Sequence, residues 1–228
     1  MADTSTAWLT SLNALVGGLF LLTAFALVAH RQVYGCLRLF VAQAVLLAVS
    51  AFLLAAFYHT WHLTVVGAVD VITKAVLIPW MFRRALHDEV QTRREITQVL
   101  NIPTALLLAL ALAIVASFLG ARLLAVAGDE AIRVNLPIGL AGLLIGGLAA
   151  TVRREAVPLF LGLLAMENSA FFAGIAVAPE LPLIAEVSIA FDVLILVFVV
   201  NVLTRAVHEH IGTTEVGALT ELTEEPSP

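Results

Sequence analysis

Long apolar stretches separated by short polar connections dominate this chain of 228 residues. Each stretch is close to the ~20 residues that an α-helix needs to cross a bilayer. Because lipid offers no partners to open backbone groups, such stretches are expected to be helical throughout. The pattern therefore predicts seven membrane-spanning helices, over residues 8–29, 36–57, 61–82, 102–124, 132–151, 156–178 and 182–205.

The composition also indicates an all-α integral membrane protein. Hydrophobic residues make up 61% of the chain, charged residues only 13%, and the mean hydropathy is +1.02, values far from those of soluble domains. The single cysteine, Cys36, excludes an internal disulfide framework and a cysteine-based metal cluster. Without a basic patch, phosphate-binding loop or hydrolase motif, we predict no nucleic-acid partner and no catalytic residue in this chain.

The placement of arginine predicts an outer N-terminus and a cytoplasmic C-terminus, because short cytoplasmic loops are rich in Lys and Arg. With that orientation, only Arg122 and Arg133 lie outside. The nine inner arginines are Arg31, Arg38, Arg83, Arg84, Arg93, Arg94, Arg153, Arg154 and Arg205. The net charge of −5 arises mainly from a polar tail, 207–228, which contains four glutamates after Ile211 and no Lys or Arg.

Span 61–82 contains two ionisable residues, Asp70 and Lys74. Their i,i+4 spacing places them on one helix face, where they can pair. A neutralised pair could simply lower the cost of membrane insertion. Since ionisable residues are expensive to keep inside a membrane, we favour a functional interpretation, in which Lys74 takes up and releases a proton.

The last two predicted spans contain three further acids, Glu167, Glu186 and Asp192. Glu167 and Asp192 lie near the middle of their spans, and Glu186 lies about 9 Å nearer the outer surface than Asp192. This stagger suits a proton relay, in which each carboxyl exchanges a proton with water or a neighbour. The alternative is that these acids complete buried hydrogen-bond networks or pair with Lys74.

Other polar or small residues in the spans have simpler interpretations. Asn13, Gln43 and Ser50 are typical of helix contacts, and Gly142 and Gly146 have the GxxxG spacing that allows close helix approach. His59 and His62 have the i,i+3 spacing of a metal pair, but no carboxylate or thiolate stands beside them. We therefore predict no metal site and no cofactor.

The final third resembles the K-type subunit of respiratory complex I and the C-type subunit of multisubunit sodium/proton antiporters. The matching positions are Arg153-Arg154, Gly162-Leu163, Met166, Asn168, Ala185-Glu186 and Ser188-Ile189. Those families place an acid directly after Gly-Leu, where this chain has Leu164. Glu167 follows three residues later, which shifts the carboxyl by about 4.5 Å on nearly the same face.

A longer pattern resembles the component E family of hydrogenase-4. It comprises Leu12-Asn13, Ile72-Thr73-Lys74 with Leu77 and Pro79, Met166-Glu167-Asn168, Pro179-Glu180-Leu181, Glu186 with Asp192, Gly212-Thr213 and Leu219-Thr220. Asp70 is not part of this pattern. The resemblance implies a five-helix part (1–151), a helical hairpin (152–206) and a cytoplasmic tail (207–228).

The resemblance also implies a function. The chain would be a non-catalytic subunit of an ion-translocating oxidoreductase in a prokaryotic inner membrane, located between antiporter-like subunits and a peripheral redox arm. Lys74, Glu167, Glu186 and Asp192 would relay protons or Na⁺, joined by Asp70 and supported by Thr73 and Asn168. The alternatives are a stand-alone seven-helix transporter or receptor, and an adapter subunit whose acids serve packing alone.

Overall fold

The computed structural model describes residues 2–85, 99–124, 130–154 and 156–177, with all side chains except those near some segment ends. This part of the chain is helical and contains no strand. Its elements are α1 (Ala2–Ala29), α2 (Val33–Tyr58), α3 (Trp61–Asp70), the π-helix η1 (Val71–Leu77), α4 (Ile78–Ala85), α6 (Ile102–Leu124), α7 (Glu130–Thr151) and α8 (Ala156–Val177).

Six segments of the described chain are long and apolar enough to cross a membrane. They are Trp8–Ala29, Val33–Tyr58, Trp61–Met81, Ile102–Leu124, Arg133–Thr151 and Val157–Val177. Each of these helical segments coincides with one of the first six predicted spans to within a few residues. The seventh predicted span, 182–205, lies outside the described residues.

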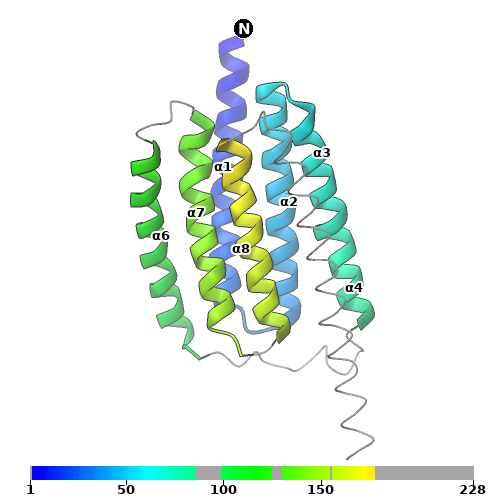
Figure 1. The fold of residues 1–228 in the computed structure, drawn as a ribbon, viewed down its shortest axis with the longest axis vertical. Helices are drawn as coiled ribbons and strands as arrows, with labels where there is room; N and C mark the ends of the chain where they lie inside the picture. The colour runs from blue at the N-terminus through cyan, green and yellow to red at the C-terminus, as the bar shows by residue number, and fades with distance from the viewer. Residues whose placement is uncertain (1, 86–98, 125–129, 155, 178–228) are drawn as a thin grey trace, which may run out of the picture.

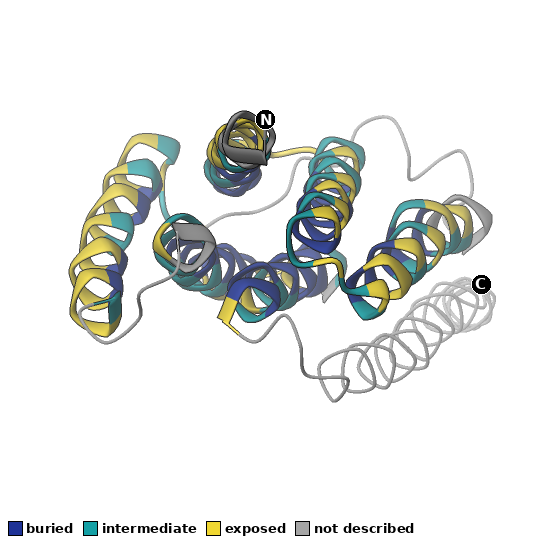
Figure 2. Ribbon diagram, turned by 90° about the horizontal axis from the view of Figure 1, so that it is seen from above, coloured by how far each residue is buried: buried dark blue, intermediate teal, exposed yellow. Residues whose placement is uncertain are grey.

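The helices form a bundle in which α7 and α8 pack most extensively (Figure 1). Helix α1 lies against both α2 and α7, and α2 also contacts α3 and α8. Helix α6 and the α3–α4 segment stand at opposite edges of the bundle (Figure 2). Because α6 packs mainly on α7, only 17% of its membrane-length window is buried.

Glycines allow the close approach of α7 and α8. A Cβ added at Gly146 would lie 2.7 Å from the Met166 nitrogen, and one at Gly142 would lie 2.5 Å from Ser169 Oγ. From the other side, a Cβ at Gly162 would meet the Ala150 backbone at 2.6 Å. The prediction that Gly142 and Gly146 serve close helix packing is therefore confirmed.

The buried apolar side chains form two separate clusters. The first cluster includes Ala24, Leu27, Phe40, Ile78, Ile145, Leu161 and Leu164. The second cluster includes Phe20, Leu47, Leu63, Phe172 and Ile175. Phe20 and Phe172 stack with their ring centroids 4.4 Å apart, which joins α1 to α8 in the second cluster.

Polar residues occupy the positions between the two clusters on three of the chain's segments. On α2, Gln43 follows Phe40 and precedes Leu47. On α8, Glu167 and Asn168 lie between Leu164 and Phe172.

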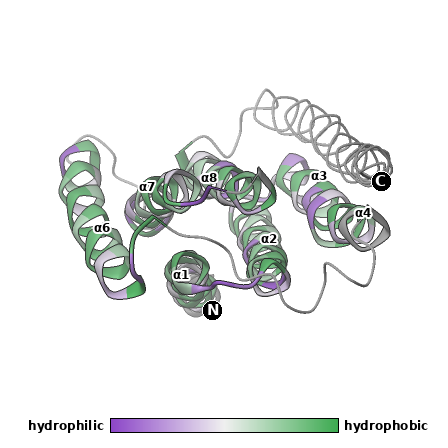
Figure 3. Cartoon of the chain, turned by 90° about the horizontal axis from the view of Figure 1, so that it is seen from below, coloured by the Kyte–Doolittle hydropathy of each residue, from purple (hydrophilic) through white to green (hydrophobic). Residues whose placement is uncertain are grey.

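The third segment shows the same order. Asp70 and Lys74 lie between Leu63 of the second cluster and Ile78 of the first. We call Gln43, Asp70, Lys74, Glu167 and Asn168 the polar layer. Four of these residues are buried and the Glu167 side chain is only 9% exposed, so the polar layer lies inside a largely hydrophobic bundle (Figure 3).

Candidate functional site

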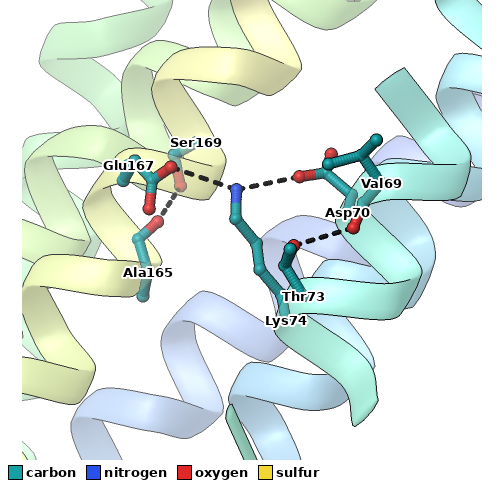
Figure 4. Close-up of polar contacts among 7 residues, drawn as sticks. All are labelled: Val69, Asp70, Thr73, Lys74, Ala165, Glu167 and Ser169. Carbon is teal, nitrogen blue, oxygen red and sulfur yellow. Dashed lines mark hydrogen bonds and ion pairs between the residues drawn. The ribbon is translucent and has the colours of Figure 1, made fainter. Parts of the chain in front are cut away.

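One lysine is shared between two carboxylates inside the bundle. Lys74 Nζ lies 2.9 Å from Asp70 Oδ1 and 3.1 Å from Glu167 Oε1 (Figure 4). The side chains of Lys74 and Asp70 are 0% exposed, and that of Glu167 is 9% exposed. The pairing within one helix that the i,i+4 spacing predicts is present, and a third partner from α8 joins it.

Lys74 lies in the π-helical turn η1. The Ile78 N–H bonds to the carbonyl of Thr73, five residues earlier, as in a π-helix. Proline 79 follows directly; it has no N–H for the Ala75 carbonyl, and its ring would clash with that carbonyl in a regular α-helix. A widened turn relieves this clash, and Lys74 is the buried residue of η1.

Phe171 is a further neighbour of the Lys74 ammonium group, and the hydroxyls of Thr73 and Ser169 bond to nearby backbone carbonyls. Lys74 Nζ lies 5.0 Å from the centroid of the Phe171 ring, within the range of a cation–π contact. Thr73 Oγ1 donates to the Val69 carbonyl at 2.7 Å, and Ser169 Oγ donates to the Ala165 carbonyl at 2.7 Å (Figure 4). Both hydroxyls are therefore engaged with their own helices.

Charge couples the three groups of this cluster. When all three are ionised, Asp70 and Glu167 contribute two negative charges and Lys74 one positive charge. Charges at such distances interact strongly in a medium of low dielectric constant. Loss or gain of a proton at one group therefore changes the affinity of the other two for protons.

The structure describes three of the five predicted relay residues. The structure brings together Lys74, Asp70 and Glu167, and Thr73 and Asn168 neighbour them in sequence. Glu186 and Asp192 lie outside the described residues. His59 ends α2 in the left-handed region with φ 55°, and the His62 ring lies against Trp61.

A second buried polar group joins three helices nearer the N-terminal end of α1. Asn13 Nδ2 donates to Asn135 Oδ1 at 2.7 Å, and Ser50 Oγ donates to Asn13 Oδ1 at 2.7 Å. Asn135 Nδ2 completes the ring by donating to Ser50 Oγ at 3.1 Å. Asn13 and Ser50 are thus helix-contact residues, as predicted. Asn135 was identifiable from sequence only as a lone amide in an apolar span.

Arg153 has a structural role that its sequence position does not reveal. From the sequence it is only a loop charge that orients the chain, yet its side chain is buried. Its guanidinium donates to the carbonyls of Leu27 and Pro158 and contacts Cys36 Sγ at 3.3 Å. Burial lowers the pKa of Arg153 from its usual value, although an arginine remains charged in proteins. Arg153 thereby ties the end of α1 to the beginnings of α2 and α8.

Comparison with known proteins shows a relative that matches this chain over most of its length. The chain is similar to the uncharacterized protein Rv0085 of Mycobacterium tuberculosis, with 28% identity over 207 residues. The match covers 90% of this chain and 93% of that protein. No family model matches the chain, and no solved structure matches it either.

Proposed function

We propose that this protein is a proton-relay subunit of a larger ion-translocating complex in a membrane. The observation that carries the proposal is the sharing of Lys74 between Asp70 and Glu167 in the buried polar layer. Lys74 contacts one carboxylate of its own helical segment and one from α8, so a change at either carboxyl alters the environment of the other. Groups of this kind inside a membrane are expensive, and proton relays commonly use them.

The cluster exchanges a proton between two states in this proposal. In one state, Lys74 is protonated and pairs with an ionised carboxyl. In the second state, Lys74 has released its proton and the positive charge has left the cluster. Exchange between these states moves one positive charge per cycle, and a nearby redox or conformational event would drive it by favouring one state.

In our proposal, the resemblance to hydrogenase-4 component E indicates in which membrane and beside which subunits this proton exchange takes place. The chain would contain seven spans with the N-terminus outside, in the inner membrane of a prokaryote. Glu186 and Asp192 would continue the relay towards antiporter-like subunits. Electron transfer would occur in a peripheral arm, so this chain would need no cofactor of its own.

Purification of the tagged full-length chain from its native membrane tests the proposal. We expect it to migrate with other multi-pass subunits and a redox-active peripheral module, identified by mass spectrometry. Reconstituted into vesicles, the complex should take up protons during electron flow, whereas the single chain should not transport. Solute transport by the purified single chain would instead support a stand-alone transporter and contradict the proposal.

A further inference from the structure

Two buried amides of the polar layer stand apart from the ion pairs. Gln43 on α2 and Asn168 on α8 are both buried, and neither side chain has a hydrogen-bond partner among the residues that the structure describes. A buried amide without partners costs free energy, and native proteins usually supply a protein group or an ordered water. Two such amides in one layer therefore indicate that a further molecule binds to them.

Their positions place both amides at the same level of the bundle. Gln43 lies between Phe40 and Leu47 on α2, and Asn168 lies between Leu164 and Phe172 on α8. Helices α2 and α8 pack against each other, and residues of both take part in each apolar cluster. Asn168 also directly follows Glu167, whose carboxylate contacts Lys74 at 3.1 Å.

We propose that Gln43 and Asn168 bind internal water molecules that connect the polar layer to Glu167. A primary amide offers two N–H donors and a carbonyl acceptor, so it can hold water in either orientation. A buried water makes about two to four hydrogen bonds, which matches what two amides and a carboxylate provide. This inference rests on the proposed function, because the water would carry protons to and from Glu167.

X-ray hydroxyl-radical footprinting of the native complex in its membrane tests for the water directly. Radicals formed from a bound water label the side chains beside it, even where bulk solvent has no access. Phe172 is the reporter, because it is 0% exposed and one turn beyond Asn168 on α8. We expect Phe172 to be labelled in the native complex, and its complete protection would overturn the proposal.

Substitutions then link that water to the amides. Gln43→Met and Asn168→Leu keep side-chain volume but remove the donors and acceptors. We expect several-fold less labelling of Phe172 and slower proton uptake, with thermal stability unchanged or raised. The control Leu47→Met, on the same face of α2, should leave the labelling unchanged. Unchanged labelling in both amide variants would overturn the proposal, as would labelling that disappears when Na⁺ is replaced by choline, because the ligand would then be a cation.

The experiment separates this inference from the proposed function. Labelled Phe172 that depends on the amides, together with a fully active Glu167→Gln complex, would retain the water site and reject the relay. Protected Phe172 with an inactive Glu167→Gln complex would reject the water site and retain the relay. If the amide variants do not assemble, labelling of the native complex alone still decides whether water is present.

Discussion

Lys74 Nζ lies 3.1 Å from Glu167 Oε1, which links the π-helical turn η1 to α8 through a buried ion pair. The same ammonium group is 2.9 Å from Asp70 Oδ1, so Glu167 and Asp70 compete for one positive charge. This competition distinguishes the cluster from a simple neutral pair. It also means that substitutions at Glu167 and at Lys74 should have different consequences.

Glu167→Gln should separate a proton relay from a packing role. Glutamine keeps the shape and hydrogen-bonding capacity of the side chain but cannot titrate. We expect a normal yield of the assembled complex with most proton uptake lost, whereas Glu167→Asp should retain part of it. Complex yield and proton uptake are measured side by side in vesicles. A fully active glutamine variant, with a more damaging aspartate variant, would indicate an adapter subunit.

Substitutions of Lys74 test whether its ammonium group must release a proton. Lys74→Arg keeps the charge, but guanidinium does not deprotonate in the working range, so we expect coupling to fall while the complex assembles. Lys74→Met removes the shared partner of two buried carboxylates. Loss of one member of a buried pair costs about 3–5 kcal/mol, reduced here where the carboxyls can bind protons instead. Normal pumping by the arginine variant would show that Lys74 is a fixed counter-charge.

The contact between α7 and α8 should be sensitive to a single methyl group. Gly146→Ala would bring a Cβ to 2.7 Å from the Met166 nitrogen, so the helices must move apart. We expect a loss of about 1–3 kcal/mol of stability, typical of overpacking. Gly174→Ala is the matched control on α8, because its Cβ would meet nothing within 4 Å. Thermal unfolding in detergent compares the two, and equal midpoints would contradict the close contact.

Arg153 should stabilise the bundle although it lies outside the membrane-length helices. Arg153→Gln would lose hydrogen bonds from a charged donor to the carbonyls of Leu27 and Pro158. Hydrogen bonds to charged groups contribute about 1.5–3 kcal/mol each, and leaving buried carbonyls without donors adds to the loss. Arg154→Gln is the control, because Arg154 is exposed. Equal thermal stability of the two variants would remove the structural role of Arg153.

The predicted orientation can be measured at the two ends of α2. A cysteine at Trp61, which is 68% exposed just beyond α2, should react with an impermeant thiol reagent from outside the cell. A cysteine at Gln32, exposed before α2 begins, should react only after permeabilisation. The native Cys36 is buried and should contribute little background. Labelling on the opposite sides would place the N-terminus in the cytoplasm.

The sequence alone determined the helical architecture of the described chain. A segment in lipid must satisfy its backbone internally and needs about 20 apolar residues, so hydropathy locates each membrane-length helix to within several residues. For the same reason Asp70, Lys74 and Glu167 were identifiable as candidate functional residues, because a charge in an apolar span is conspicuous. The i,i+4 geometry of one helix also determined that Asp70 and Lys74 can pair.

Tertiary structure alone decided which of these charges meet. Helices that are uniformly apolar carry little information about which face packs on which neighbour, so the contact between Lys74 and Glu167 depends on how η1 and α8 are placed. Lys74 is the buried residue of the π-helical turn before Pro79, and no periodicity in the sequence predicts that turn. The burial of Arg153 likewise depends on carbonyl groups from α1 and α8 that become neighbours only in the folded bundle.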